Sequence, residues 1–376
     1  MTSFERHEAR YQRRKAKRAD KKLQKFESCD NFDSVFTYEN LYDAYKKCRK
    51  GVAWKSSVQK FITQAPLNVR NIYESLHNGK FKTKGFVEFD LMERGKKRHI
   101  RSVCIEERIV QRCLCDNALM PVLSNSFIHD NGASRVGKGY SFSIRRLSQH
   151  LSEHYRKYGN DGYILLYDFS KFFDRVSHEL VKKILSDNFN DPRILQLSYH
   201  FIDAFGDTEG LGLGSQISQI LALASANRLD HYVKEVLRIR GYGRYMDDGY
   251  LIHQDKAYLQ KCLDEIRIVC DELGIVINEK KTQIVKLSHG FTWLKVKFFV
   301  LPSGRIVKKM NRKSITKSRQ KLKALLKKVE DGKMTYRDVY DSWQAWNAYA
   351  KQFDSYTTRR NTAKIYNSLF VTPIFN

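Results

Sequence analysis

The chain has 376 residues, 42% of them hydrophobic, and 68 Lys and Arg against 41 Asp and Glu. This length exceeds one compact core and suits about two or three subdomains, while the formal charge of +27 calls for an anionic partner, with nucleic acid as the first candidate. No run approaches the ~18 apolar residues of a membrane-spanning helix and no secretory signal is recognisable, so we expect a cytoplasmic protein without a membrane partner.

The first 25 residues are strongly basic and contain few large apolar side chains. Their cations are Arg6, Arg10, Arg13, Arg14, Lys15, Lys17, Arg18, Lys21, Lys22 and Lys25. Two interpretations stay open, a solvated tail and an arm that becomes ordered on RNA.

From Tyr38 to about His150 the pattern mixes short helices and strands. A strand is predicted at 86–89, followed by a basic cluster and then a helix that starts near Glu107 and loses its apolar spacing at Pro121. The segment 134–139 is a glycine-flanked basic loop, which can let backbone and cations approach a phosphate, although this signal is weak by itself.

Two strand-like segments carry acids. The apolar run 163–167 ends at Asp168, and 79 residues later Asp247 and Asp248 stand together between Arg244 and further strand formers. Adjacent carboxylates are costly unless something balances their charge. Three carboxylates from neighbouring strands would form an oxygen cage suited to magnesium or manganese rather than zinc, and two such ions can assist in-line phosphoryl transfer.

Between these acids lies a predicted helix capped by Ser177 and a glycine-rich stretch, 210–219, that leads into a helix of small residues at 220–226. In one interpretation, the glycine-rich stretch forms a wall against a substrate base pair. A plain loop at the start of a helix is the alternative.

Residues 280–329 hold 16 Lys and Arg and no Asp or Glu. Apolar residues recur at helical spacing from Ile315 to Val329, so the helix can bury one stripe and direct its cations toward a phosphate backbone. A solvated surface is the alternative. The aromatic residues that follow, from Trp343 to Tyr356, are interpreted as core rather than as a base-stacking platform.

Seven cysteines show no CxxC pair and no histidine at zinc spacing. We therefore expect reduced and mostly buried thiols.

Taken in order, these segments resemble the motifs of bacterial and phage reverse transcriptases, from about Tyr38 to Tyr356. The corresponding segments are 96–98 with 107–111, 135–139, 168–173, 214–219, 245–248 and 273–282. The resemblance implies an α+β right-hand polymerase with fingers, a palm built on an antiparallel sheet, and a helical thumb. Its expected boundaries are 1–35 for a basic arm, 36–160 for fingers, 161–185 and 210–290 for palm, 186–209 for an insertion, and 291–376 for a basic helical thumb.

The same resemblance implies roles for individual residues. Asp168, Asp247 and Asp248 would be catalytic and, with Phe169, would hold two Mg²⁺ ions, with Mn²⁺ as the alternative. The expected dNTP-binding residues are Lys96, Arg98, Phe173, Gly214, Gln219 and Lys281. The expected nucleic-acid contacts are Arg135, Lys138, Tyr245, Met246, Trp293, Lys295, Lys317, Arg319 and Lys323.

Phe173 bears on the choice of sugar. By resemblance its ring lies beneath the ribose 2′ position, where it offers no hydrogen bond to a 2′-hydroxyl, so deoxynucleotides are expected. An ordinary core role for Phe173 is compatible with this one.

Some positions depart from the common pattern. Leu213 and Gln219 replace a frequent glutamine and proline, and the Ser218-Gln219 ending resembles diversity-generating retroelements and antiphage defence enzymes. Residues 291–295 replace a Phe-Leu-Gly-Tyr primer-grip pattern, which favours the defence-associated branch.

The sequence therefore predicts an RNA-directed DNA polymerase that makes cDNA from a structured non-coding RNA in an antiphage defence system. Two alternatives stay open, a diversity-generating enzyme and a maturase-like RNA-binding protein with incidental polymerase activity. A third is template-independent nucleotide addition. The RNA, the primer, any accessory protein and the oligomeric state are not indicated.

Overall fold

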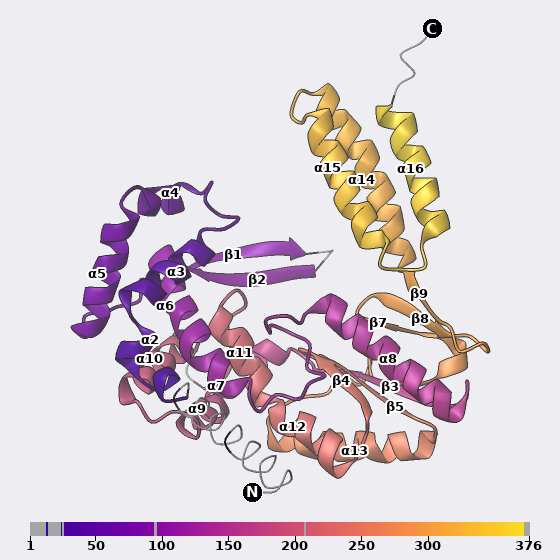
Figure 1. The fold of residues 1–376 in the computed structure, drawn as a ribbon, viewed down its shortest axis with the longest axis horizontal. Coiled ribbons are helices and arrows are strands. Elements are labelled where there is room, and N and C mark those ends of the chain that lie inside the picture. Colours follow the sequence, from indigo (N-terminus) through magenta and orange to yellow (C-terminus); the bar gives the residue numbers. More distant parts are fainter. Residues whose placement is uncertain (1–12, 14–23, 25, 94–95, 207, 372–376) are drawn as a thin grey trace, which may run out of the picture. The chain divides into compact units, whose positions relative to one another are not determined.

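The computed structural model describes residues 13, 24, 26–93, 96–206 and 208–371, with the backbone alone considered at 93, 96 and 98. Helices and antiparallel sheets make up the described chain (Figure 1), so the predicted α+β class is confirmed. The chain divides into two units. Unit 1 comprises Met1–Gly139, Phe169–Val236 and Glu265–Ile277, and unit 2 comprises Tyr140–Asp168, Leu237–Asp264 and Asn278–Asn376. The subdomain boundaries expected from the sequence stay a prediction.

Unit 1 is mainly helical and includes one antiparallel hairpin, β1 with β2. Its elements are α2 (Phe32–Val35), α3 (Tyr38–Cys48), α4 (Ser56–Thr63), α5 (Ala65–His77), β1 (Phe86–Glu93), β2 (Lys96–Val103), α6 (Ile105–Leu114), η1 (Cys115–Leu119), α7 (Met120–Leu123), η2 (Phe172–Arg175), α9 (His178–Ser186), α10 (Pro192–Asp203), α11 (Gln216–Ser225), α12 (Asn227–His231) and η3 (Tyr232–Val236).

Unit 2 contains two antiparallel sheets and a group of C-terminal helices. Its elements are α8 (Tyr140–Tyr158), β3 (Tyr163–Asp168), β4 (Gly241–Tyr245), β5 (Asp248–His253), β6 (Gln283–Lys286), η4 (Leu287–His289), β7 (Phe291–Trp293), β8 (Val296–Val300), β9 (Ile306–Met310), α14 (Arg312–Glu330), α15 (Tyr336–Ala350) and α16 (Tyr356–Phe370). Helix α13 (Lys256–Glu272) begins in unit 2 and ends in unit 1.

The larger sheet of unit 2 has the strand order β4-β5-β3-β6 with antiparallel pairing throughout. Side chains alternate across a strand, so Ile164, Leu166, Tyr250 and Ile252 share one face. They join a buried cluster with α8 and with the sheet β7-β8-β9. This packing fixes the strand register, because a shift of one residue would expose the apolar face.

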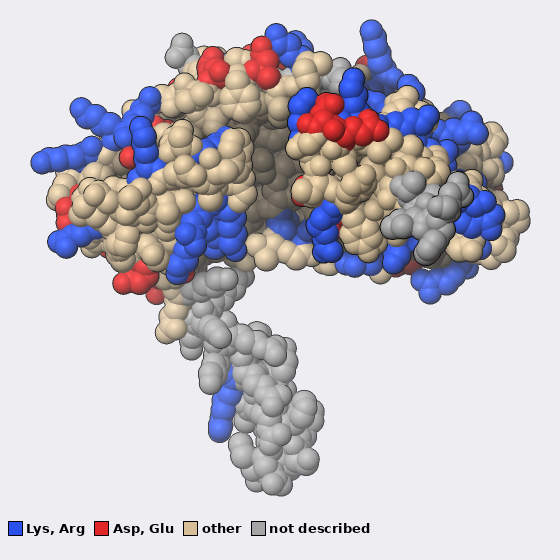
Figure 2. Space-filling model, turned by 90° about the horizontal axis from the view of Figure 1, so that it is seen from above, with Lys and Arg blue, Asp and Glu red and all other residues tan. Residues whose placement is uncertain are grey.

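The helices α14, α15 and α16 lie side by side at the C-terminal end of unit 2 (Figure 1). Leu322, Leu325, Val339 and Tyr366 form their own buried cluster. The apolar spacing predicted for residues 315–329 is therefore confirmed as the buried stripe of a helix. Lys and Arg side chains are spread over much of the surface seen in Figure 2, in keeping with the charge of +27.

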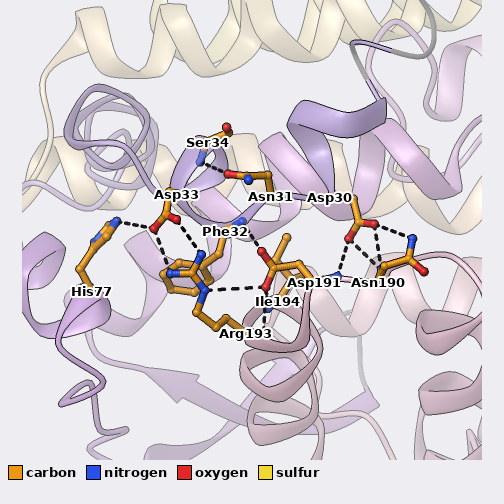
Figure 3. A network of polar contacts seen from close by, with 10 residues as sticks. All are labelled: Asp30, Asn31, Phe32, Asp33, Ser34, His77, Asn190, Asp191, Arg193 and Ile194. Carbon is orange, nitrogen blue, oxygen red and sulfur yellow. Dashed lines mark hydrogen bonds and ion pairs between the residues drawn. The ribbon is translucent and has the colours of Figure 1, made fainter.

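A polar network holds the start of α2 against the start of α10 in unit 1 (Figure 3). The Asp30 carboxylate accepts hydrogen bonds from the backbone N–H groups of Asn190 and Asp191, at 2.9 and 3.0 Å. Asp191 in turn accepts from Phe32 N at 2.7 Å and caps α10. Residues 30–35 are thus packed, whereas the basic residues 6–25 lie almost entirely outside the described residues.

Two local expectations concern Ser177 and Pro121. Ser177 caps α9 as predicted, because its side chain accepts from Leu180 N at 3.3 Å. The apolar spacing was expected to break at Pro121, and there the chain leaves the π-helical turn η1 and enters α7, with Pro121 in the first turn of α7. The first turn is where a helix tolerates proline.

Further expectations concern cysteines and membranes. Five of the seven cysteines are buried, as predicted. Over the part of the chain that is described, no helix combines the length and the apolar character needed to cross a bilayer.

Candidate functional site

Two of the predicted catalytic acids face each other across the larger sheet of unit 2. Asp168 ends β3 and Asp248 begins β5, and the two are direct partners in the antiparallel pair. Asp168 is buried, with 6% of its surface exposed, and Asp247 and Asp248 are half-buried. The apolar strand residues behind them thus present the acids at one end of the sheet.

The turn between β4 and β5 presents Asp247. Tyr245 pairs with Asp248, which leaves Met246 and Asp247 as a two-residue hairpin loop. Met246 has a φ of 56°, in the left-handed region that such tight loops require. The fully buried Arg244 donates a hydrogen bond to the Met246 carbonyl at 2.9 Å. A buried cation therefore stabilises the turn, a role that sequence reasoning missed.

Lys281 and Asn278 hold Asp168 from the following segment of unit 2. The Lys281 ammonium lies 2.7 Å from each oxygen of the Asp168 carboxylate. The Asn278 side chain donates to the same carboxylate at 3.2 Å, and its backbone N–H donates to the Asp168 carbonyl at 2.7 Å. Burial opposes the charge on Lys281, but the hydrogen bond to Asp168 and the negative charges nearby outweigh it and raise the pKa of Lys281. Sequence reasoning also missed Asn278. Its position three residues before Lys281 was the signal that could have indicated a contact with Asp168.

The site concentrates negative charge. Burial raises the pKa of Asp248 to about 7, and the charges of Asp247 and Asp168 act in the same direction. The ammonium groups of Lys281 and Lys295 partly oppose this effect. Like charges that are close together and partly shielded from water favour a bound cation.

The expected cage of three converging carboxylates is not found ready-made. Among the described residues, no group of three His, Cys, Asp or Glu side chains is placed to hold a metal ion. In this structure the Lys281 ammonium engages the Asp168 carboxylate instead. The available donors are nevertheless all oxygen atoms, which suit Mg²⁺ or Mn²⁺, and a bound cation would oppose the burial and neighbouring negative charges that raise the pKa of Asp248.

The turn between β7 and β8 carries Lys295. Trp293 pairs with Val296, so Leu294 and Lys295 form a two-residue loop with φ values of 47° and 67°. Two non-glycine residues in this region store strain of about 1–3 kcal/mol each. The Tyr140 hydroxyl donates to the Leu294 carbonyl at 3.2 Å and helps to hold the loop.

Trp293 itself is buried, with 4% exposed, and its ring packs against Tyr250 with centroids 4.8 Å apart. Its predicted contact with nucleic acid is untested, and the structure gives its side chain a place in the core. Lys295 is exposed.

Three of the predicted dNTP-binding residues, Phe173, Gly214 and Gln219, belong to unit 1. The Leu211 backbone N–H donates to the Phe173 carbonyl at 2.7 Å, which joins the glycine-rich stretch to η2. Gly214 has a φ of +109°, and a Cβ there would lie 3.3 Å from Ile100 on β2. Ser134 donates to the Gln219 side chain at 2.8 Å, which links the basic loop to α11.

The cations expected around these residues differ in how they are engaged. The side chains of Lys96 and Arg98 lie outside the described residues. Arg135 donates to the carbonyls of Ile128, Asn131 and Ser124, and burial lowers the pKa of its guanidinium. Lys138 donates to the His129 carbonyl. Both cations thus have internal partners, and their contact with nucleic acid stays a prediction.

The three cations predicted on α14 do not have equivalent surroundings. Lys317 and Lys323 are exposed, whereas Arg319 is half-buried and its guanidinium donates to Thr362 of α16 at 3.3 Å. Arg319 therefore helps to join two helices, and Lys317 and Lys323 are free to meet a phosphate.

The profile of the family described as "Reverse transcriptase (RNA-dependent DNA polymerase)" matches residues 82–298, more than half of the chain. The chain belongs to the reverse transcriptase family. Protein YkfC of Escherichia coli (strain K12) is 24% identical over 270 residues, covering 61% of this chain and 66% of YkfC. The chain thus spans just under two thirds of the length of that relative.

Solved structures similar to this chain include telomerases of two Candida species. The telomerase of Candida albicans, in complex with a fragment of telomeric RNA, matches with a TM-score of 0.48 and 12% identity, covering 82% of this chain and 66% of that one. Apo telomerase of Candida tropicalis, truncated from its C-terminal domain, matches with a TM-score of 0.46 and 14% identity, covering 60% and 55%.

Proposed function

We propose that this chain is an RNA-directed DNA polymerase, a nucleotidyltransferase that adds deoxynucleotides to a primer end. The observation that carries the proposal is the direct pairing of Asp168 with Asp248, next to Asp247, in a member of the reverse transcriptase family. Dense negative charge at one end of an antiparallel sheet suits a reaction in which phosphate oxygens and carboxylates share cations.

Divalent ions held by Asp168, Asp247, Asp248 and the backbone of Phe169 would supply charge neutralisation at the attacking hydroxyl and the triphosphate. The chain's own residues do the positioning. Arg244 keeps the Met246–Asp247 turn in place, and Lys281 holds the Asp168 carboxylate in position. Phe173 would exclude a 2′-hydroxyl, so we propose deoxynucleotides as substrates, with Lys96 and Arg98 neutralising the triphosphate.

We further propose a structured non-coding RNA as the template, cDNA as the product and the cytoplasm as the location. The acid-free stretch 280–329 supports a tight grip on a phosphate backbone. The Ser218-Gln219 ending supports a role in antiphage defence, with the diversity-generating class as the alternative.

Substitution of the paired acids tests the catalytic proposal. Asp247→Asn combined with Asp248→Asn keeps the size of both side chains and removes the charges. We expect primer extension on an RNA template to fall by roughly a thousandfold or more, because several kcal/mol of transition-state stabilisation is lost. The affinity for the same RNA, measured without nucleotides, should stay within about twofold, because contacts between basic residues and the RNA phosphates determine it.

The matched control is Asp271→Asn, an exposed acid of α13, which should leave extension unchanged. Extension that survives in the double variant would contradict the proposal. Biological activity that survives without DNA synthesis would favour the maturase-like alternative. Product that is not complementary to the template would favour template-independent addition.

A further inference from the structure

The loop between α3 and α4 presents a tryptophan to solvent. Trp54 has 74% of its surface exposed, and its indole Nε1 donates to the Gly51 carbonyl at 3.2 Å. Gly51 takes a φ of +76°, and backbone bonds from Val52 N to Arg49 O and from Lys55 N to Val52 O close the turns around it. The one polar atom of the indole is thus satisfied inside the loop, and the ring is held in place while exposed.

Exposure of this ring is costly unless it has a partner. A tryptophan normally buries most of its large apolar area, and tryptophans are enriched at interfaces. Val58 and Phe61 of the adjacent α4 are buried and supply the local core, so Trp54 is not needed for packing.

The chain around Trp54 is basic and free of acids. From residue 44 to residue 73 it has no Asp or Glu and carries Lys46, Lys47, Arg49, Lys50, Lys55, Lys60 and Arg70. Lys46, Lys47 and Arg70 pair with acids from outside this stretch. No described acid forms an ion pair with the remaining four, Arg49, Lys50, Lys55 and Lys60, all of which are exposed.

Arg49, Lys50 and Lys55 lie in the same loop as Trp54, and Lys60 lies on the following helix, α4. The Lys55 ammonium lies 5.7 Å from the centre of the Trp54 ring. Lys and Arg side chains project from the edge of the molecule that carries α4 and α5, on the left in Figure 2. An exposed, fixed aromatic ring among uncompensated cations matches a base that stacks while its neighbouring phosphates meet positive charge.

We infer that Trp54, with Arg49, Lys50, Lys55 and Lys60, forms a binding site for single-stranded nucleic acid. A duplex keeps its base faces stacked on one another, so a strand with free bases is the form that can use the ring. The site lies in unit 1, before the segment 82–298 that matches the family, and it is separate from the carboxylates of unit 2. It goes beyond the proposed polymerase activity and does not depend on it.

The first test measures binding of fluorescein-labelled oligouridine, oligothymidine and a short RNA duplex by anisotropy, without nucleotides or primer. Trp54→Ala should weaken the affinity for the single strands by about five- to a hundredfold, the range of one base–aromatic stack. Trp54→Phe should keep most of the affinity, because a ring remains. The matched control is Leu67→Ala, an exposed apolar residue of the same acid-free stretch, which should have no effect.

The comparison of strands identifies the ligand. A larger loss for oligouridine than for oligothymidine assigns the site to RNA, an equal loss assigns it to either strand, and both results support the inference. The inference is overturned if Trp54→Ala loses as much affinity for the duplex as for the single strands. It is also overturned if the single-strand affinity of Trp54→Ala stays within about twofold of the unsubstituted chain, and a protein partner would then be the occupant of the site. Circular dichroism and thermal unfolding of Trp54→Ala should match the unsubstituted chain, since the ring supports no core.

A second readout is intrinsic fluorescence. The chain has four tryptophans, and Trp293, Trp343 and Trp346 are buried or half-buried. Oligouridine should quench the emission of Trp54, and Trp54→Phe should abolish that quenching. Replacing Lys50 and Lys55 with Ala should lower the log–log salt slope of single-strand binding by up to about 1.4. These readouts need no DNA synthesis, so a failure of the polymerase proposal and a failure of this one are distinguishable.

Discussion

At the scale of single residues, the positive charge of Lys281 compensates the neighbouring negative charges of Asp168 and Asp248. Its ammonium lies 2.7 Å from both oxygens of a carboxylate that is 6% exposed. Removing one member of such a pair leaves a desolvated charge without a partner, which costs more than the pair contributes. Because the Lys281 side chain is about half exposed, at 51%, screening by water reduces that cost.

Lys281→Met should therefore lower the free energy of unfolding by about 1–2 kcal/mol without divalent ions. Millimolar Mg²⁺ should then raise the unfolding temperature of this variant more than that of the unsubstituted protein, because the ion replaces the missing charge. Thermal unfolding with and without Mg²⁺ measures both effects.

Lys281→Arg, which keeps the charge, serves as the control and should unfold close to the unsubstituted protein. If Mg²⁺ shifted all three proteins equally, Lys281 and the ion would not act on the same carboxylates.

At the scale of elements, α14 divides its cations between two tasks. Leu322 and Leu325 bury one stripe of the helix, and Arg319, on the flank of that stripe, bonds to Thr362 of α16. Lys317 and Lys323 are exposed and belong to a stretch without any acid. Of these three cations, the exposed Lys317 and Lys323 can release counterions on binding a phosphate backbone.

Lys317→Ala with Lys323→Ala should accordingly reduce the log–log salt slope of RNA binding by about 1.4–1.8, since each lost phosphate contact removes about 0.7–0.9. Binding titrations over a series of KCl concentrations provide the slope. Arg319→Ala should instead lower thermal stability, because it removes a contact between helices. A slope that does not change in the double variant would rule out this face of α14 as a phosphate-binding surface.

At the scale of the whole molecule, the charge of +27 works against the folded state of the free protein. Folding brings 68 cations closer together than 41 acids can offset. Surface ion pairs such as Arg70–Glu74 and Arg337–Asp341 are mostly exposed, so water and salt screen the attraction between their charges. Repulsion should therefore outweigh these pairs.

The unfolding temperature of the free protein should rise between low and physiological ionic strength, as salt screens the repulsion. A short RNA should raise it further by binding the folded state. Differential scanning fluorimetry over a salt series tests this, with neutral dextran as the control for a polymer without charge. A fall of the unfolding temperature on adding salt would mean that the ion pairs dominate.

The sequence by itself determined the α+β class and the family. The apolar run that ends at Asp168, the Ser177 cap and the stripe from Ile315 to Val329 are local patterns, and local hydrogen bonding and periodicity suffice to read them. The family match covers residues 82–298, which contain all of the ordered motifs.

The tertiary structure alone decided which groups meet. Lys281 and Asn278 reach Asp168 across more than a hundred residues, Trp293 is drawn into the core, and Arg319 turns to α16. Trp54 is left outside the core, although its sequence neighbours gave no sign of this. Burial and charge compensation depend on packing between distant segments, so a residue's type and spacing cannot determine whether it becomes core, counter-charge or binding surface.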